Sequence, residues 1–194
     1  IESYLKNNLF EHGFLWATAI IGQEPFEVFY CQNSSIFQAR LSSIERELSQ
    51  LAFLKENYPL IVAITGEIGN NAFDHNIGNW PDVPGLFFGY NLKSKQIFLA
   101  DRGQGILKTL KRVKPELSND QDALTTAFTE ILSGRSPESR GNGLKYVTRI
   151  IKMIPLKLLF QSGQAVINID SVNSDIKPKI AEKKIPGCLA LIKF

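Results

Sequence analysis

This sequence has few cysteines, no long apolar run and only a small excess of positive over negative charge. Cys31 and Cys188 are the two cysteines among 194 residues, and they lie far apart without the spacing of metal ligands. We expect them to be buried, reduced thiols of a cytoplasmic protein. No apolar run approaches the roughly 20 residues that cross a bilayer, so we expect no membrane segment. Because the chain starts at Ile1 rather than Met, the lack of a signal peptide carries little weight.

The charge balance argues against two classes of partner. The chain has 22 basic and 19 acidic residues, a net charge of +3, and they are spread along its whole length. This excess is too mild to favour nucleic acid or a membrane surface as the main partner. With 44% hydrophobic residues and no internal repeat, the composition is that of a globular domain with a substantial core.

Helical and strand patterns alternate along the chain. Asn33 can cap a helix, and Ile64, Ile68 and Ala72 form an apolar stripe at spacings of four. We expect helices at 1–21, 34–55, 59–78, 106–113, 120–132 and 142–153, and strands at 26–31, 85–92, 96–100, 156–161, 165–169 and 188–194. This order predicts the α+β class, with one mixed sheet and helices on one face. We expect residues 1–24 to form a helical extension and residues 25–194 the main domain.

The first candidate motif lies on the helix predicted at 59–78. Glu67, Asn71 and His75 follow one another at spacings of four, so they share a helical stripe at the edge of the buried one. The Asn oxygen suits Mg²⁺, and a carboxylate one turn away can deprotonate or orient an attacking group. A solvated polar face is the other interpretation of this stripe.

Two glycine-containing motifs follow. In Asp101-Arg102-Gly103-Gln104-Gly105, the Asp ends an apolar strand. Its carboxylate suits the amine of adenine and disfavours the keto oxygen of guanine, although a plain turn explains the pattern as well. Arg140-Gly141-Asn142-Gly143-Leu144 leads into a helix, where free backbone N–H groups can bind phosphate. A flexible helix entry is the alternative there.

The three motifs, in this order and context, resemble the N box, G1 box and G2 box of the GHKL superfamily (gyrase, heat-shock chaperone, histidine kinase, MutL). The resemblance spans about residues 25–194. It is nearest to stand-alone anti-sigma-factor serine kinases and sensor-kinase catalytic domains. It implies the Bergerat ATP-binding fold, a two-layer α/β sandwich, with ATP and Mg²⁺ as ligands.

The resemblance also implies roles for individual residues. Asn71 would ligate Mg²⁺, and Glu67 would be the general base or position a water. Asp101 would bind the adenine amine, with Gly103 and Gly105 shaping the base pocket. The residues expected near the phosphates are His75, Arg140, Gly141, Gly143 and Leu144, with Asn70, Asp74 and Lys145 as secondary candidates.

Three functions are compatible with this resemblance. The leading one is a bacterial signalling kinase that transfers the γ-phosphate of ATP to Ser, Thr or His of a protein partner. The second is a nucleotide-gated interaction module, in which ATP orders the segment Ile106–Arg140 with little turnover. The third is a gyrase- or chaperone-like ATPase, disfavoured because no transducer domain follows Phe194. His12 precedes Gly13 and does not fit a phosphoacceptor. A homodimer is left open.

Overall fold

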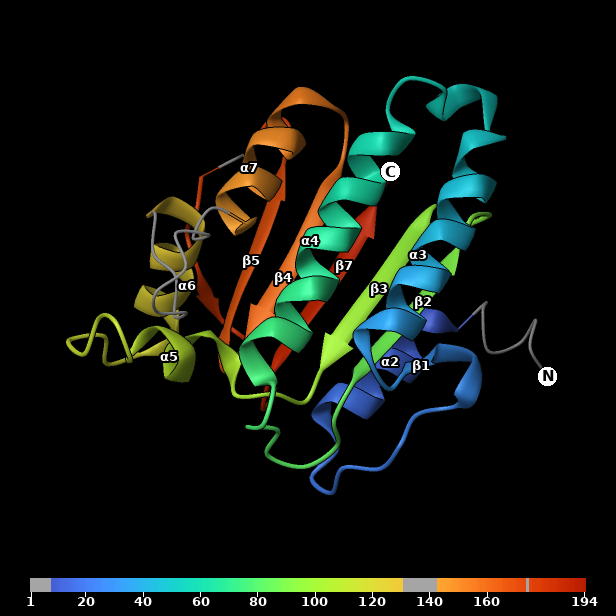
Figure 1. Ribbon diagram of the computed structural model, residues 1–194. Coiled ribbons are helices and arrows are strands. Elements are labelled where there is room, and N and C mark those ends of the chain that lie inside the picture. Colours follow the sequence, from blue (N-terminus) through green and yellow to red (C-terminus); the bar gives the residue numbers. More distant parts are fainter. Residues whose placement is uncertain (1–7, 131–142, 174) are drawn as a thin grey trace.

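The computed structural model describes residues 8–130, 143–173 and 175–194 (Figure 1). The helices are α2 (Leu9–Thr18), α3 (Ser34–Ser49), α4 (Tyr58–Asn76), α5 (Gly105–Leu110), α6 (Asp120–Thr129) and α7 (Gly143–Met153), with short 3₁₀ turns at Glu27–Phe29 and Ala52–Leu54. The strands are β1 (Tyr30–Cys31), β2 (Leu86–Asn91), β3 (Gln96–Asp101), β4 (Lys157–Ser162), β5 (Ala165–Asp170), β6 (Lys179–Ile180) and β7 (Cys188–Lys193). The α+β class is thus confirmed. In these ranges no helix has the length and apolar character needed to cross a membrane.

The strands form one sheet in the order β1-β2-β3-β7-β4-β5-β6, and each neighbouring pair is antiparallel. The prediction of a mixed sheet is therefore wrong. The reason is the position of β7. A helical connection leads from β3 to β4, which run in the same direction, but β7 inserts between them and is antiparallel to both. Parallel neighbours are thereby avoided.

Helices cover both faces of the sheet, not one face as predicted. In Figure 1, α3, α4 and α7 lie side by side in front of the sheet, and their apolar side chains share one core with it. On the opposite face, α2 packs against β2, β3 and β7, with Leu9, Ala17, Phe87 and Phe98 in a second core. Gly13 permits this approach, because a Cβ atom there would collide with the Phe98 ring. Of the expected helical extension, the part that forms α2 therefore covers the sheet.

The central helix α4 is positioned by features that the sequence already displays. Ile64, Ile68 and Ala72 are buried as predicted, and they face the shared core. Gly69 lies against Phe37 of α3 so closely that a Cβ atom would collide with the ring. This glycine lets α3 and α4 pack in close contact and fixes the orientation of the polar stripe on α4. Asn33 caps α3 by accepting the Ile36 N–H at 3.0 Å.

Both cysteines are free thiols, as predicted. Cys31 is buried in the core, and burial raises its pKa to about 11. Cys188 begins β7 and is half-buried rather than buried as predicted, but desolvation still raises its pKa well above the ordinary value. Neither thiol is therefore ionised at neutral pH.

Candidate functional site

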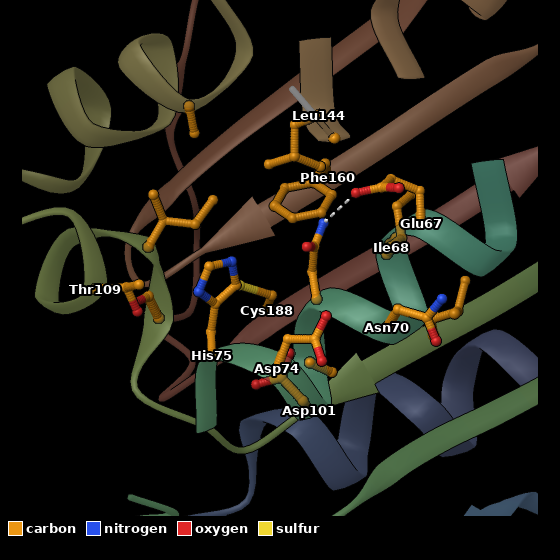
Figure 2. Close-up of a pocket in the computed structure, with 18 of the residues that line it drawn as sticks. Glu67, Ile68, Asn70, Asp74, His75, Asp101, Thr109, Leu144, Phe160 and Cys188 are labelled. Atoms are coloured by element: carbon orange, nitrogen blue, oxygen red, sulfur yellow. Dashed lines mark hydrogen bonds between the residues drawn. The ribbon is translucent and has the colours of Figure 1, made fainter. Parts of the chain in front are cut away.

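A cavity of about 660 Å³ lies between α4, the end of β3, α5 and the start of α7 (Figure 2). Its walls combine apolar side chains such as Ile68, Leu99 and Phe160 with polar groups from three separate segments of the chain. Its lining includes most of the residues predicted from the sequence, namely Glu67, Asn71, His75, Asp101, Gly105, Gly143 and Leu144. The three motifs therefore converge on one cavity.

The polar stripe of α4 forms one wall of this cavity. Glu67, Asn71 and His75 are all partly buried, at the edge of the apolar stripe as the spacing predicts. The Asn71 side-chain amide donates to Glu67 Oε1 at 3.4 Å. This hydrogen bond uses the amide nitrogen, and Asn71 Oδ1 accepts no hydrogen bond from the described residues. The oxygen is thus available to a ligand, and a solvated polar face does not describe this stripe.

Two secondary candidates on α4, Asn70 and Asp74, also line the cavity. Asn70 lines the cavity, but its Oδ1 accepts a hydrogen bond of 2.6 Å from Gln38 of α3. Asp74 lines the cavity and is exposed. Asn70 therefore contributes mainly to the packing of α3 on α4.

Asp101 is a buried carboxylate, only 5% exposed, at the end of β3. Burial raises its pKa to about 7, and hydrogen bonds from the backbone N–H groups of Gly103 and Cys188 oppose that rise. The Gly103 bond is 2.8 Å long. Gly187 packs so closely that a Cβ atom there would collide with Asp101 Oδ1. The carboxylate is consequently fixed in place while it still lines the cavity.

The two glycines after Asp101 have different roles. Gly105 lines the cavity and has φ +73°, a conformation that favours glycine. Gly103 does not line it: a Cβ atom there would collide with the side-chain amide of Asn76, which accepts the Gln104 N–H at 2.8 Å. Gly103 therefore shapes the site indirectly, by letting the loop pack on the end of α4.

The third motif is described from Gly143 onward, and Arg140 and Gly141 lie outside the described residues. Gly143 begins α7 against Glu67, so that a Cβ atom there would collide with the Glu67 carboxylate. Leu144 lines the cavity next to Phe160 (Figure 2). The start of α7 is thus in direct contact with the predicted general base.

Arg149 is a lining residue that our sequence reasoning missed. It lies four residues after Lys145 on α7, so the two cations share one helical face, and both line the cavity. Neither side chain forms an ion pair or hydrogen bond with the residues that the structure describes. The spacing of four from Lys145 is the signal that could have revealed it.

Two comparisons with known proteins bear on this cavity. No family model matches the chain, and no curated protein matches it. The functional assignment therefore rests on the geometry and chemistry of this cavity.

Proposed function

We propose that this chain is an ATP- and Mg²⁺-binding domain with the Bergerat fold of the GHKL superfamily, and that it transfers the γ-phosphate to a protein partner. The observation that supports this most is the convergence of three separate motifs on one cavity. A volume of about 660 Å³ lies within the roughly 300–1,000 Å³ typical of small-molecule sites. Chance placement of three weak motifs would scatter them over the surface.

The adenine end of the ligand is assigned to Asp101. Its carboxylate is buried, fixed by two backbone N–H groups and open to the cavity. A hydrogen bond from an exocyclic amine stabilises an ionised carboxylate in such an apolar setting, whereas a keto oxygen there repels it. The apolar lining from Ile68, Leu99 and Ile106 suits the faces of a purine ring.

The phosphate end is assigned to the opposite part of the cavity, between α4 and the start of α7. Lys145 and Arg149 supply positive charge there, and Asn71 Oδ1 is an oxygen of the kind that Mg²⁺ prefers. The described part of the chain has no group of three or more His, Cys, Asp or Glu side chains that could hold a metal ion. A single Asn oxygen nevertheless fits Mg²⁺, which commonly keeps waters and binds through substrate phosphates. The metal would supply neutralisation of the phosphate charge.

Glu67 is assigned the role of general base. It is partly buried on the cavity wall, and the Asn71 amide holds its Oε1. From there its carboxylate can accept the proton of a hydroxyl or water that attacks the terminal phosphate. The hydrogen bond from Asn71 links the base to the residue proposed to hold the metal.

A nucleotide-gated interaction module is the second candidate, and the position of Gly143 favours it. Because Gly143 lies against the Glu67 carboxylate, a ligand that binds at Glu67 also acts on the start of α7. A partner would then bind according to the position of α7, and the chain would turn over little ATP.

The experiment that separates these candidates follows the label of [γ-³²P]ATP. The chain is incubated with Mg²⁺, with and without a bacterial extract, and free phosphate is scored against label on protein. Label on a protein supports the kinase, free phosphate alone supports an ATPase, and ATP binding without either supports the gated module. Absence of ATP binding by calorimetry would contradict all three.

Two variants separate metal binding from chemistry. Asn71→Ala should lose the Mg²⁺-dependent part of ATP affinity, because it removes the oxygen ligand. Glu67→Ala should keep ATP binding and lose turnover by roughly 10²- to 10⁴-fold, the usual contribution of a general base. Unchanged turnover in Glu67→Ala would refute the general-base role and favour the gated module.

A further inference from the structure

Asp101 and Arg102 are neighbours in the chain whose side chains point to opposite faces of the sheet. Alternation along β3 places Leu99 in the core shared with α3 and α4, and Phe98 and Ala100 in the core under α2. Asp101 continues the first set and reaches the cavity, whereas Arg102 continues the second. One peptide bond therefore joins the proposed adenine-binding carboxylate to the α2 side of the molecule.

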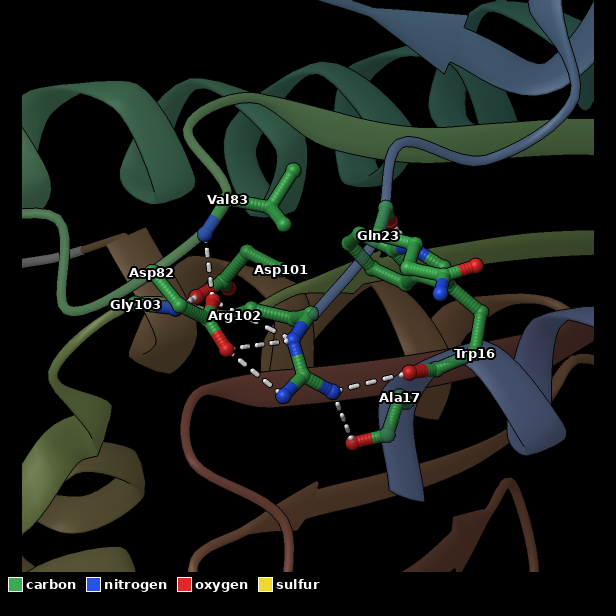
Figure 3. A network of polar contacts seen from close by, with 8 residues as sticks. All are labelled: Trp16, Ala17, Gln23, Asp82, Val83, Asp101, Arg102 and Gly103. Carbon is green, nitrogen blue, oxygen red and sulfur yellow. Dashed lines mark hydrogen bonds and ion pairs between the residues drawn. The ribbon is translucent and has the colours of Figure 1, made fainter. Parts of the chain in front are cut away.

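Arg102 is a buried cation with partners on two sides (Figure 3). Its side chain is 2% exposed. Nε and Nη2 donate to the Asp82 carboxylate at 2.6–3.1 Å, and Nη1 donates to the carbonyls of Trp16 at 2.9 Å and Ala17 at 3.4 Å. The planar guanidinium thus bridges the loop before β2 and the end of α2, a geometry that a lysine cannot reproduce.

The carbonyls that Arg102 binds belong to the last turn of α2. Such carbonyls carry the negative end of the helix dipole, so a cation stabilises them. The Trp16 carbonyl also accepts the Ala19 N–H at 3.4 Å. The last turn of α2 contains no basic residue of its own. Arg102, which is remote in the sequence, supplies that cation and caps α2 at its C-terminal end.

Asp82 completes the bridge as an ionised carboxylate. Burial raises its pKa, but hydrogen bonds from Arg102 and the Val83 N–H, together with the Arg102 charge, more than reverse this and hold the pKa below its ordinary value. The Asp82 side chain is 33% exposed. The ion pair is therefore intact at neutral pH and can be broken by a conservative substitution at its accessible end.

We propose that Arg102 is a positioning residue that couples the docking of α2 on the sheet to the placement of Asp101, so that α2 regulates nucleotide binding. This inference rests on the proposed function, since it takes Asp101 to be the residue that binds adenine. Coupling is reciprocal: release of α2 weakens nucleotide binding, and nucleotide binding stabilises α2.

The test uses the whole chain with Arg102→Lys and Asp82→Asn, and Lys114→Gln as the control. Lys114 forms an exposed ion pair with Glu130 at 2.8 Å, outside the cavity and away from α2. Affinities for ATP and for inosine triphosphate, which has a keto oxygen in place of the amine, are measured by calorimetry. Amide exchange of α2 is measured with and without ATP.

Wild type should prefer ATP and show slower exchange in α2 when ATP is bound. Both test variants should bind ATP about five- to tenfold more weakly. Their preference for ATP over inosine triphosphate should shrink, and ATP should no longer slow amide exchange in α2. The inosine comparison matters because general destabilisation lowers both affinities together. Asp82→Asn keeps the test open if Arg102→Lys does not fold.

Three results would overturn the coupling. They are unchanged nucleotide affinity in a folded test variant, an equal loss in Lys114→Gln, and reduced affinity with the ATP effect on α2 intact. Failure of wild type to bind ATP would instead refute the proposed function, and this inference with it. Binding by wild type with unaffected variants refutes the coupling alone.

Discussion

At the scale of single residues, Asp101 combines burial with an open side toward the cavity. An exposed carboxylate would prefer water to a ligand, and a fully enclosed one would reach no ligand. Asp101 is 5% exposed, yet it lines a cavity of about 660 Å³. Its two backbone hydrogen bonds leave acceptor capacity on the carboxylate, which can bind about four donors.

The first prediction at this scale concerns the base. ATP and ADP should bind, and GTP should not, because its keto oxygen faces the Asp101 carboxylate without a proton to share. Asp101→Asn should weaken ATP binding by roughly 10- to 100-fold, the usual cost of a mispaired buried polar group. Calorimetric titration with the three nucleotides measures this. Equal affinity for GTP would remove Asp101 from the adenine site.

The second prediction concerns pH. In the proposed function the amine of adenine binds the ionised form of Asp101, whose pKa in the free protein is raised to about 7 by burial. Protonation therefore competes with the ligand, and affinity falls as pH drops below 7. Between pH 8 and pH 6 the loss should be about tenfold.

Adenosine is the suitable ligand for this pH test, because it has no phosphate that titrates in the same range. Asp101→Asn is the matched control, since the variant has no carboxyl proton at that position. A flat profile in wild type, or the same slope in Asp101→Asn, would show that Asp101 does not contact the base.

At the scale of elements, the start of α7 packs against the Glu67 side chain of α4. Gly143 lies so close to Glu67 that a side chain would displace either the carboxylate or the helix. Gly143→Ala should therefore reduce ATP binding and turnover together, by roughly tenfold or more. Gly66→Ala is the control, because Gly66 lies beside Glu67 in the sequence, but a Cβ atom added there would meet the Leu41 side chain at 3.1 Å and not Glu67. Full activity in Gly143→Ala would contradict this contact.

Most elements could be predicted because their patterns are local. The cap at Asn33, the stripe of Ile64, Ile68 and Ala72, and the apolar runs of β2 and β3 appear where expected. Two features could not be predicted. The short edge strand β6 is exposed and has no alternation to detect. The packing of α2 behind the sheet depends on Gly13 and on Arg102, which is remote in the sequence.

In the candidate site, too, local patterns could be predicted and tertiary contacts could not. Spacings of four on α4 predicted that Glu67, Asn71 and His75 share a face, and all three line the cavity. Gly103 was expected in the pocket wall, but the structure places it behind the wall, against Asn76. That contact depends on how the loop meets the end of α4, which is a tertiary feature. Arg149 was missed because its place in the cavity lining depends on how α7 packs on the rest of the molecule.

At the scale of the whole molecule, the cavity is lined by several helices and strands that are far apart in the sequence. Its lining comes from α4, the end of β3, α5, α7 and β7. A ligand bound there contacts all of these elements at once. Because a ligand that binds only the folded state stabilises it by mass action, nucleotide binding should raise the stability of the entire domain.

The expected size of this effect can be stated. At 100 times the dissociation constant, ATP with Mg²⁺ should add about 2.7 kcal/mol to the free energy of unfolding. For a chain of this length that corresponds to a rise in melting temperature of roughly 5–10 °C. The rise should be small with GTP and should largely disappear in Asp101→Asn. Scanning fluorimetry measures the melting temperature. An equal rise with ATP and GTP would mean that the site does not distinguish adenine from guanine.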